Sequence, residues 1–496
     1  MTSTVGRLAI VVHSHLPWLL GHGRWPVGEE WLRQAWAHSY IPVIEMLRER
    51  AERGQRSMLT LGITPVLAAQ WDEPTSVTEQ ARWIEDWRLR AIGKAIETQG
   101  DKHIAYRDAL RHFRNASHAA RQFQEHWSAG GSAAIRPLVG SGAIELLGGP
   151  VTHTFTPHLV DEVANAALES GLNDATVRFG RRPRGIWTPE CAYAPGMQDW
   201  YSRHGVTHTM LDGPTLQGVG VSLHRPHRIA GSDTVVFGRD LSLTYRVWSP
   251  KRGYPGGKWY QDFHSFDHGW GLRAFRVSDK TSSKKEPYDP ERAHSSAIRD
   301  AHDFLEHARR TLAGSTEPNP VVVVAYDTEL FGHWWHEGPV FLAEVIDQAS
   351  AAGIELTTLE KEIERASDGP AIEIGPGSWG SGKDFRVWES GEAGDLDQQG
   401  RGAQYAVLAH LTNPSAQEST LGRKADNDYL VSELLLALAS DWAFMITKDS
   451  AADYARARSS EHFQRVADFL RSTHDPHIHG VDTRLPFVDA RYCTKN

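Results

Sequence analysis

The run of four valines at residues 321–324, extended by Ala325, constrains the fold of this chain more than any other stretch. It is too short to span a membrane and too rich in β-branched residues for a stable helix. We therefore predict a strand buried on both faces, as in a parallel sheet. Asp327 and Glu329 follow directly. The carboxyl ends of parallel strands hold the chemistry of α/β folds, so Asp327 either is a catalytic carboxylate or caps the next helix.

A second apolar stretch ends in the same way. Residues 184–187 lead into Pro189 and Glu190, and the strand should end there because proline cannot donate to a β-ladder. Two carboxylic acids at the ends of separate strands suit glycoside hydrolysis or transfer, in which one is the nucleophile and the other the acid/base. The sequence therefore points to Glu190 and Asp327 as a catalytic pair.

Length, charge and cysteine content narrow the class of protein. The 496 residues suit two or three domains, and the net charge of -9 argues against a nucleic-acid groove or an anionic membrane surface. No glycine-rich phosphate loop follows a strand, so we expect no nucleotide cofactor. We recognise no signal peptide or transmembrane stretch, and Cys191 and Cys493 are too few for a disulfide framework, so we expect a cytoplasmic location. Cys191 follows Glu190 but has no partner base nearby, and we interpret it as a small buried residue.

Tryptophan is the compositional outlier, with 18 copies against 13 tyrosines. Many of these tryptophans lie in loops rich in glycine, proline and histidine, as Trp25 does, rather than on apolar helix faces. Indole rings in such loops favour a stacking surface for a flat ligand such as a sugar, although they can also fill a core. We therefore interpret Trp25 as a candidate sugar contact.

Polar residues interrupt three otherwise apolar segments. His13 and His15 end the strand predicted at the N-terminus and point to the same face, as metal ligands, as hydrogen-bonding groups for a substrate, or as a structural pair. Glu145 lies inside a predicted strand, and it either faces the same site as the two histidines or pairs with an arginine. Asp441 falls on the apolar stripe of a helix predicted over residues 428–446, where it binds a substrate hydroxyl or forms a buried salt bridge.

A long irregular region follows the strand predicted over residues 233–237. In it, Tyr254 is flanked by glycines and a proline. Long loops inside compact domains are usually functional, and we interpret Tyr254 as the tip of an active-site lid. The alternative is a surface loop with an incidental tyrosine.

Strands and helices alternate as far as about residue 375, which predicts an α/β catalytic domain over residues 1–375. Residues 76–128 are charged and helical, and we interpret them as an insertion between strands. Residues 376–496 are predicted to form a helical C-terminal domain that contributes to the active-site cleft.

As a set, five motifs resemble glycoside hydrolase family 57, and within it the α-1,4-glucan branching enzymes. They are His-Ser-His-Leu-Pro-Trp at 13–18, Glu145 with Gly-Gly-Pro at 148–150, Trp-Thr-Pro-Glu at 187–190, Tyr-Asp-Thr-Glu-Leu-Phe-Gly-His-Trp-Trp at 326–335, and Ser-Asp-Trp at 440–442. The resemblance implies a distorted (β/α)7 barrel with a helical insertion and an all-helical C-terminal domain. It also implies a retaining reaction on an α-1,4-glucan such as amylose, maltodextrin or a glycogen-like polysaccharide, with Glu190 as nucleophile and Asp327 as acid/base.

By the same resemblance the lid tyrosine is Tyr254, catalysis needs no metal, and substrate contacts fall on His13, His15, Trp270, Trp379, Trp388 and Asp441. Two activities of the same family remain as alternatives, 4-α-glucanotransferase and α-amylase. From other classes, a metal-dependent polysaccharide deacetylase using His13 and His15 and a catalytically silent glucan-binding protein also remain.

Overall fold

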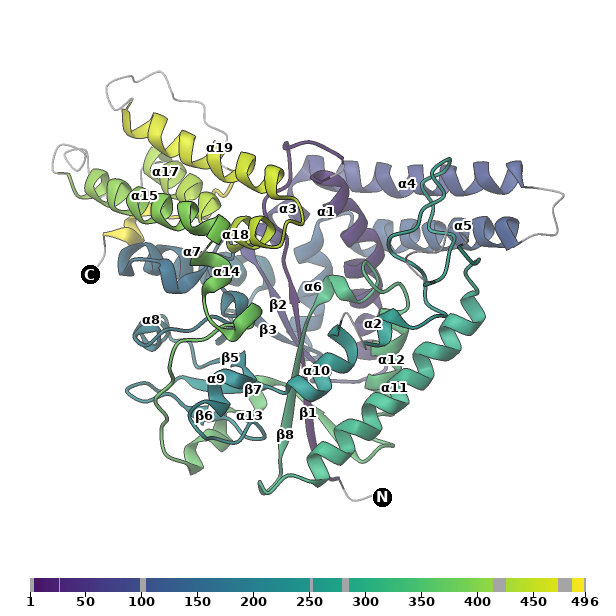
Figure 1. Cartoon of the computed structure of the whole chain (residues 1–496), viewed down its shortest axis with the longest axis horizontal. Helices are drawn as coiled ribbons and strands as arrows, with labels where there is room; N and C mark the ends of the chain where they lie inside the picture. The colour runs from purple at the N-terminus through teal and green to yellow at the C-terminus, as the bar shows by residue number, and fades with distance from the viewer. Residues whose placement is uncertain are drawn as a thin grey trace.

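Seven parallel strands close into a barrel in the computed structural model, which describes residues 4–25, 27–98, 104–249, 253–278, 285–389, 391–413, 425–471 and 484–494 (Figure 1). Around the ring the strands are β1 (Gly6–Ser14), β2 (Thr60–Ile63), β3 (Glu145–Gly148), β4 (Gly185–Ile186), β5 (His208–Asp212), β7 (Val235–Arg239) and β8 (Val321–Asp327), and β8 pairs again with β1. The predicted seven-stranded α/β barrel is confirmed.

Strand β1 has three partners. Along one edge it pairs with β8 from Arg7 to His13. Along the other edge, β9 (Ile354–Thr357) pairs with its first half and β2 with its second half. A short strand, β6 (His227–Arg228), runs antiparallel to β7.

The side chains of β1 and β8 alternate between two cores, which explains their unbroken apolar runs. Ala9 and Val11 of β1 pack inside the barrel with Val323 of β8. Leu8 and Val324 point outward and pack against the surrounding helices. Both faces of these strands are thus buried, as the valine run predicts.

Helices cover the outside of the ring. They are α1 (Glu29–Ala35), α2 (Ile41–Glu52), α3 (Pro65–Asp72), α6 (Gly131–Gly140), α7 (Asp161–Phe179), α8 (Met197–Arg203), α9 (Gly213–Gln217), α10 (Leu241–Trp248), α11 (Pro290–Ala313), α12 (Gly338–Gln348) and α13 (Leu359–Glu362). None of the helices in the described residues is long and apolar enough to cross a lipid bilayer.

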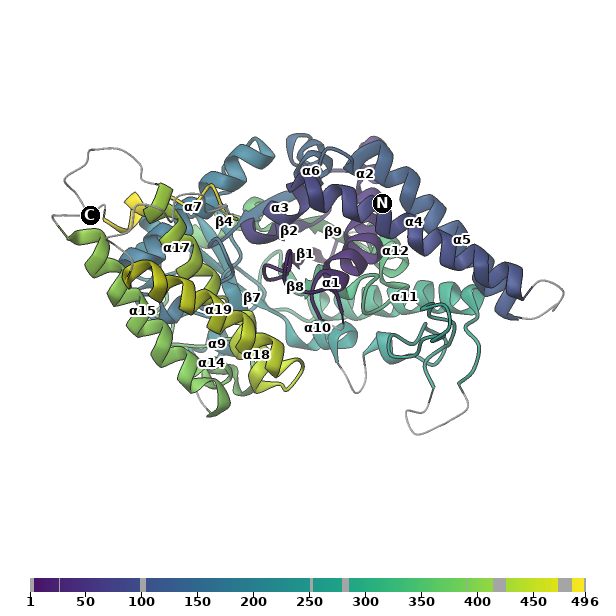
Figure 2. The same cartoon turned by 90° about the horizontal axis from the view of Figure 1, so that it is seen from above.

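Two further groups of helices lie on opposite sides of the barrel, as Figure 2 shows. The first is the insertion, with α4 (Pro74–Glu97) and α5 (Ile104–Gln122), which continues as a π-helix to Trp127. The second is the C-terminal group, α14 (Arg386–Glu389), α15 (Gly394–Thr412), α17 (Ala425–Ala437), α18 (Ser440–Thr447) and α19 (Ala452–Arg471).

The single helix predicted over residues 428–446 is wrong, because the chain breaks between α17 and α18. At the break, Ala439 forms a β-bridge with Thr154, and the N–H of Ser440 donates to the carbonyl of His153. These contacts with the loop after β3 replace the helical hydrogen bonds. The break brings Ser440 and Asp441 to the carboxyl ends of the barrel strands.

Candidate active site

Glu190 lies in a tight turn just after β4. Pro189 and Cys191 flank it in a single 3-10 turn, and both Glu190 and Cys191 have left-handed backbone conformations, with φ of 59° and 49°. A non-glycine residue in this conformation costs on the order of 1–3 kcal/mol and is held there by its surroundings. The turn directs the Glu190 carboxylate toward the C-terminal helices.

Two side chains donate hydrogen bonds to that carboxylate, one to each oxygen. The indole Nε1 of Trp379 lies 2.7 Å from Oε2, and the hydroxyl of Ser440 lies 2.8 Å from Oε1. The backbone N–H of Trp379 also donates to the carbonyl of Glu190, which fixes the two segments together. Such donors stabilise the charged form of a carboxyl group.

Asp327 ends β8 as the register partner of His13 on β1. Its side chain is half-buried. Within the part of the chain that the structure describes, no donor lies within hydrogen-bonding distance of its carboxylate. The two acids therefore differ in their hydrogen bonding although both belong to one site.

Burial raises the pKa of both carboxyls to about 7. For Asp327, desolvation has the largest effect and the negative charge of Glu190 the next, and the positive charge of Arg239 opposes them. For Glu190, the two hydrogen bonds described above oppose desolvation. The hydrogen bonds to Glu190 favour its charged form, and no such bond to Asp327 is found among the described residues.

Three histidine rings stack beside the two acids. His13 stacks on Trp187 with ring centroids 4.3 Å apart, and His15 stacks on His153 at 4.1 Å. Burial lowers the pKa of His13 and of His153 well below the usual value, so both rings are neutral. His15 contacts Asp441 through Nε2, at 2.9 Å.

The donor atoms of His15, His153 and Asp441 lie within 4.8 Å of one another, close enough to consider a metal ion. However, the planes of the two stacked rings differ by only 20°. Their nitrogen lone pairs lie in nearly parallel planes and do not converge on one point, as tetrahedral or octahedral coordination needs. This geometry suits a metal ion poorly.

Arg239 adds a positive charge at the same end of the barrel. It is the last residue of β7, and its Nε lies 2.8 Å from an oxygen of Asp212, the last residue of β5. Lys383 contacts the other oxygen of Asp212 at 2.8 Å. The guanidinium also lies over the ring of Trp379, 5.1 Å from its centroid. This cluster places a cation beside the two acids without neutralising either directly.

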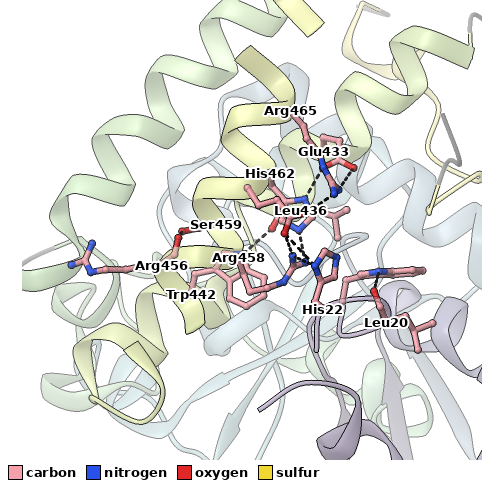
Figure 3. A network of polar contacts seen from close by, with 12 residues as sticks. Leu20, His22, Glu433, Leu436, Trp442, Arg456, Arg458, Ser459, His462 and Arg465 are labelled. Atoms are coloured by element: carbon pink, nitrogen blue, oxygen red, sulfur yellow. Dashed lines mark hydrogen bonds and ion pairs between the residues drawn. The ribbon is translucent and has the colours of Figure 1, made fainter. Parts of the chain in front are cut away.

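A buried polar network joins the C-terminal helices to the loop after β1, as Figure 3 shows. Arg458 of α19 is 3% exposed and contacts His22 of that loop at 2.5 Å and His462 at 2.8 Å. The other nitrogen of His462 contacts Glu433 of α17 at 2.6 Å. Arg458 also lies over the ring of Trp442, which follows Ser440 and Asp441 on α18. The network thus supports the helix that reaches the site.

The structure brings together most of the residues predicted for the site. In addition to the two acids, these are His13, His15, Trp379 and Asp441. The charge of Asp441 raises the pKa of both Glu190 and Asp327, so it lies near each of them.

Tyr254 and Glu145 lie elsewhere. The hydroxyl of Tyr254 donates to Asp303 of α11 at 2.5 Å, and no contact with Glu190 or Asp327 is found among the described residues. Glu145 is the first residue of β3, at the opposite end of the barrel from the acids, because the site is formed where the strands end. The expectation that it faces the two histidines or pairs with an arginine is wrong: its partners are His208 and Thr60.

Three of the predicted tryptophans are also outside the cluster. Trp270 packs on Gly93 of α4, and its Nε1 donates to Glu97. Trp388 is 2% exposed and stacks on Phe155, so it is covered by protein. Trp25 is 68% exposed, at the surface of the loop after β1.

Four residues of the site were not assigned a role from the sequence: Trp187, His153, Ser440 and Arg239. Trp187 and Ser440 stand inside motifs that the sequence analysis singled out, three residues before Glu190 and one before Asp441. His153 ends the glycine-rich segment after β3, a position that could have marked it. Arg239 is preceded by an ordinary strand and carries no such signal.

Comparisons with known proteins agree with this geometry. The sequence model of Glycosyl hydrolase family 57 matches residues 9–374, and the model described as 1,4-alpha-glucan branching enzyme, C-terminal, matches residues 406–481. A probable 1,4-alpha-glucan branching enzyme of Mycobacterium tuberculosis is 43% identical over 477 residues, covering 92% of this chain and 90% of that protein. The 1,4-alpha-glucan branching enzyme of Thermococcus kodakarensis is 30% identical, covering 94% and 74%. The crystal structure of the GH57-type branching enzyme of Pyrococcus horikoshii is 29% identical, with a TM-score of 0.89 over 99% of this chain and 97% of that one.

Proposed function

The chain belongs to glycoside hydrolase family 57, and on that premise we propose that it is a 1,4-α-glucan branching enzyme. Its reaction cleaves an α-1,4 bond of a glucan and re-forms it as an α-1,6 branch. The observation that carries the proposal is the pair of acids in one site, of which only Glu190 receives hydrogen bonds from Trp379 and Ser440. The match of residues 406–481 to a branching-enzyme region supports branching over other activities of the family.

The first step forms a covalent intermediate. The Glu190 carboxylate attacks the anomeric carbon of a glucosyl unit, the bond from that carbon to the glycosidic oxygen breaks, and Asp327 gives its proton to the leaving oxygen. The product is a glucan chain linked to Glu190 through an ester of inverted configuration. The shortened chain leaves with the proton.

The second step transfers the chain. Asp327, now a carboxylate, takes the proton from the 6-hydroxyl of an acceptor glucan, and the acceptor oxygen attacks the anomeric carbon and displaces Glu190. Two inversions retain the α configuration. Water must be kept from the intermediate, and the aromatic wall of Trp187 and Trp379, whose rings meet at 5.1 Å, supports such exclusion.

The organisation into parts belongs to the same proposal. Residues 1–375 serve as the catalytic barrel with an insertion at 76–128, and residues 376–496 form a helical part that supplies Ser440 and Asp441. The histidines His13 and His15 bind sugar hydroxyls, and no metal or cofactor takes part. A cytoplasmic location is supported by two cysteines that are both free and buried, Cys191 and Cys493.

Incubation with amylose tests the proposal. Branching lowers iodine staining and gives a product that a debranching enzyme splits into short linear chains, whereas 4-α-glucanotransferase or α-amylase activity gives products without α-1,6 points. Glu190→Gln serves as the inactive control. Linear products alone would refute branching. Deacetylation of an acetylated polysaccharide that stops in chelator would instead identify the metal-dependent alternative.

A further inference from the structure

The two hydrogen-bond donors of Glu190 differ in kind. The indole N–H of Trp379 only donates, so its bond to Oε2 can form whether or not Glu190 carries a proton on its other oxygen. The hydroxyl of Ser440 can donate or accept, so by itself it can serve either form of the carboxyl group. The group that orients the hydroxyl of Ser440 therefore determines whether Glu190 is charged.

His153 is the group that orients it. The ring Nδ1 of His153 lies 2.9 Å from the oxygen of Ser440, and the imidazole and hydroxyl are 4% and 2% exposed. The other nitrogen, Nε2, is buried without a partner. A buried unpaired N–H is rarer and more costly than a buried unpaired acceptor, so the proton of the neutral ring belongs on Nδ1. His153 then donates to Ser440, whose own proton points at Glu190.

We propose that Ser440, held as a donor by His153, is the positioning residue that decides which of the two acids is ionised, keeping Glu190 as the nucleophile while Asp327 retains the proton. This inference rests on the proposed function. It adds that the C-terminal helical part supplies the decisive hydrogen bond, since Ser440 is the first residue of α18. In the opposite order, a protonated Glu190 donates to Ser440, Ser440 donates to Nδ1, and the ring proton sits on Nε2. The two orders hold the same number of protons: the proton on Glu190 comes from Asp327, which becomes the ionised acid, and the ring proton of His153 moves from Nδ1 to Nε2.

Other charged groups around Glu190 do not make this choice. Asp441 raises the pKa of both acids. The charges of His15 and Arg239 lower the pKa of Asp327 and so favour the opposite assignment. His13 faces His153 with a neutral ring, 4.9 Å between centroids. Among the described residues, Trp379 and Ser440 donate hydrogen bonds to the carboxylate of Glu190, and of these two donors the hydroxyl of Ser440 is the one that can be reversed.

The test measures the pH dependence of kcat/KM on amylose for Ser440→Ala. Loss of a hydrogen bond to a charged group should move the acidic limb upward by about one pH unit and lower kcat about tenfold. The matched control is Ser432→Ala, which removes an equally buried hydroxyl from α17 that bonds only to backbone carbonyls. Its acidic limb should stay in place. An unmoved limb in Ser440→Ala would overturn the proposal.

A second pair of variants tests His153 and guards against misfolding of the first. His153 has a left-handed backbone with φ 57°, which asparagine tolerates well, and the asparagine amide places an N–H donor near the position of Nδ1. His153→Asn should keep the acidic limb of wild type, whereas His153→Leu should move it upward as Ser440→Ala does. Equal profiles for the two variants would contradict the role of His153.

Nitrogen NMR of histidine-labelled enzyme provides a direct readout. The His153 signals, identified by their loss in His153→Asn, should show the proton on Nδ1 in wild type. A proton on Nε2 would contradict the inference even if the enzyme branches amylose. Failure of wild type to turn over amylose would instead refute the proposed function, so the two failures are distinguishable.

Discussion

His15 and Asp441 are 426 positions apart in the chain, yet His15 Nε2 lies 2.9 Å from an oxygen of Asp441. The contact joins the end of the first barrel strand to the first turn of α18. Each side chain is only 9% to 13% exposed, so the contact is well shielded from solvent. It places a third carboxyl group beside Glu190 and Asp327.

Asp441→Asn should shift the pH–activity profile to lower pH. The charge of Asp441 raises the pKa of Glu190 and of Asp327, so its removal lowers both, by about half a unit through partly screened charges. The profile of kcat/KM on amylose measures the shift. Asp453→Asn, at an exposed position on α19, controls for the loss of one charge. A profile that moves to higher pH would contradict the proposed placement of Asp441.

Azide should distinguish the roles of the two acids. Glu190→Gly and Asp327→Gly should each lower amylose turnover by roughly a thousandfold or more. With an activated α-glucosyl donor, azide attacks the Glu190→Gly site directly and gives the β-azide. In Asp327→Gly it attacks the intermediate on Glu190 and gives the α-azide. The anomeric proton resonance identifies the product, and the same anomer from both variants would refute the assignment.

Glu329→Gln should make the stability of the folded protein fall less steeply as the pH rises into the alkaline range. Burial raises the pKa of Glu329 from 4.5 to about 8, and Tyr40 and the N–H of His15 donate to it. The folded state therefore holds an extra proton between about pH 4.5 and 8. The stabilisation is complete below that window and is lost as the pH rises through 8.

The midpoint of thermal unfolding between pH 5 and 9 measures this effect. Gln keeps an acceptor for both donors, so the variant should lose less stability than wild type over that range. Glu355→Gln, at an exposed position in β9, should follow wild type. A steeper decline for Glu329→Gln would contradict the buried protonated state.

Tyr254→Ala should raise hydrolysis relative to α-1,6 transfer if Tyr254 acts as a lid. In the structure its hydroxyl contacts Asp303 and its ring lies 5.7 Å from that of Phe341 on α12, so closure requires the loop to leave these partners. Reducing sugar released per branch formed measures the ratio. Tyr254→Phe, which keeps the ring but removes the hydrogen bond to Asp303, should retain the ratio of wild type. An unchanged ratio in Tyr254→Ala would remove the lid hypothesis.

Arg458→Met should destabilise the attachment of the C-terminal helices by about 2–4 kcal/mol. The substitution removes the centre of a buried polar network and leaves His22 and His462 without the hydrogen bonds that Arg458 donates. Chemical denaturation measures the loss. Arg456→Met, two residues away but 41% exposed, should cost about 1 kcal/mol or less. Similar losses of stability in the two variants would show that the buried network stabilises the protein no more than a surface ion pair does.

The sequence predicts best what is encoded locally. Val321 to Val324 mark a strand by their branching, and an acid after such a strand marks a site, so both Asp327 and the barrel follow from short windows. Glu190 is found in the same way. The insertion helices also follow from local periodicity.

Contacts between segments that are far apart in the sequence cannot be predicted from any short stretch of residues. The bond between Ser440 and Glu190 spans 250 positions, and the helix break that permits it depends on Thr154 and His153 pairing with the chain at Ala439 and Ser440. The partner of Glu145 does not follow from the sequence for the same reason, because His208 lies two barrel strands away. Neighbouring residues in the sequence are enough to predict that a residue lies in a strand. The end of the barrel at which its side chain lies depends on the register between strands, which the local sequence does not give.

The three-way pairing of β1 has a consequence for synthesis of the chain on the ribosome. The strands that complete the two edges of β1, β8 and β9, are synthesised more than 300 residues after residues 6–14. Until then β1 exposes unsatisfied backbone groups on an apolar strand, which invites pairing with other chains. The barrel can therefore close around β1 only after residues 321–357 have been synthesised.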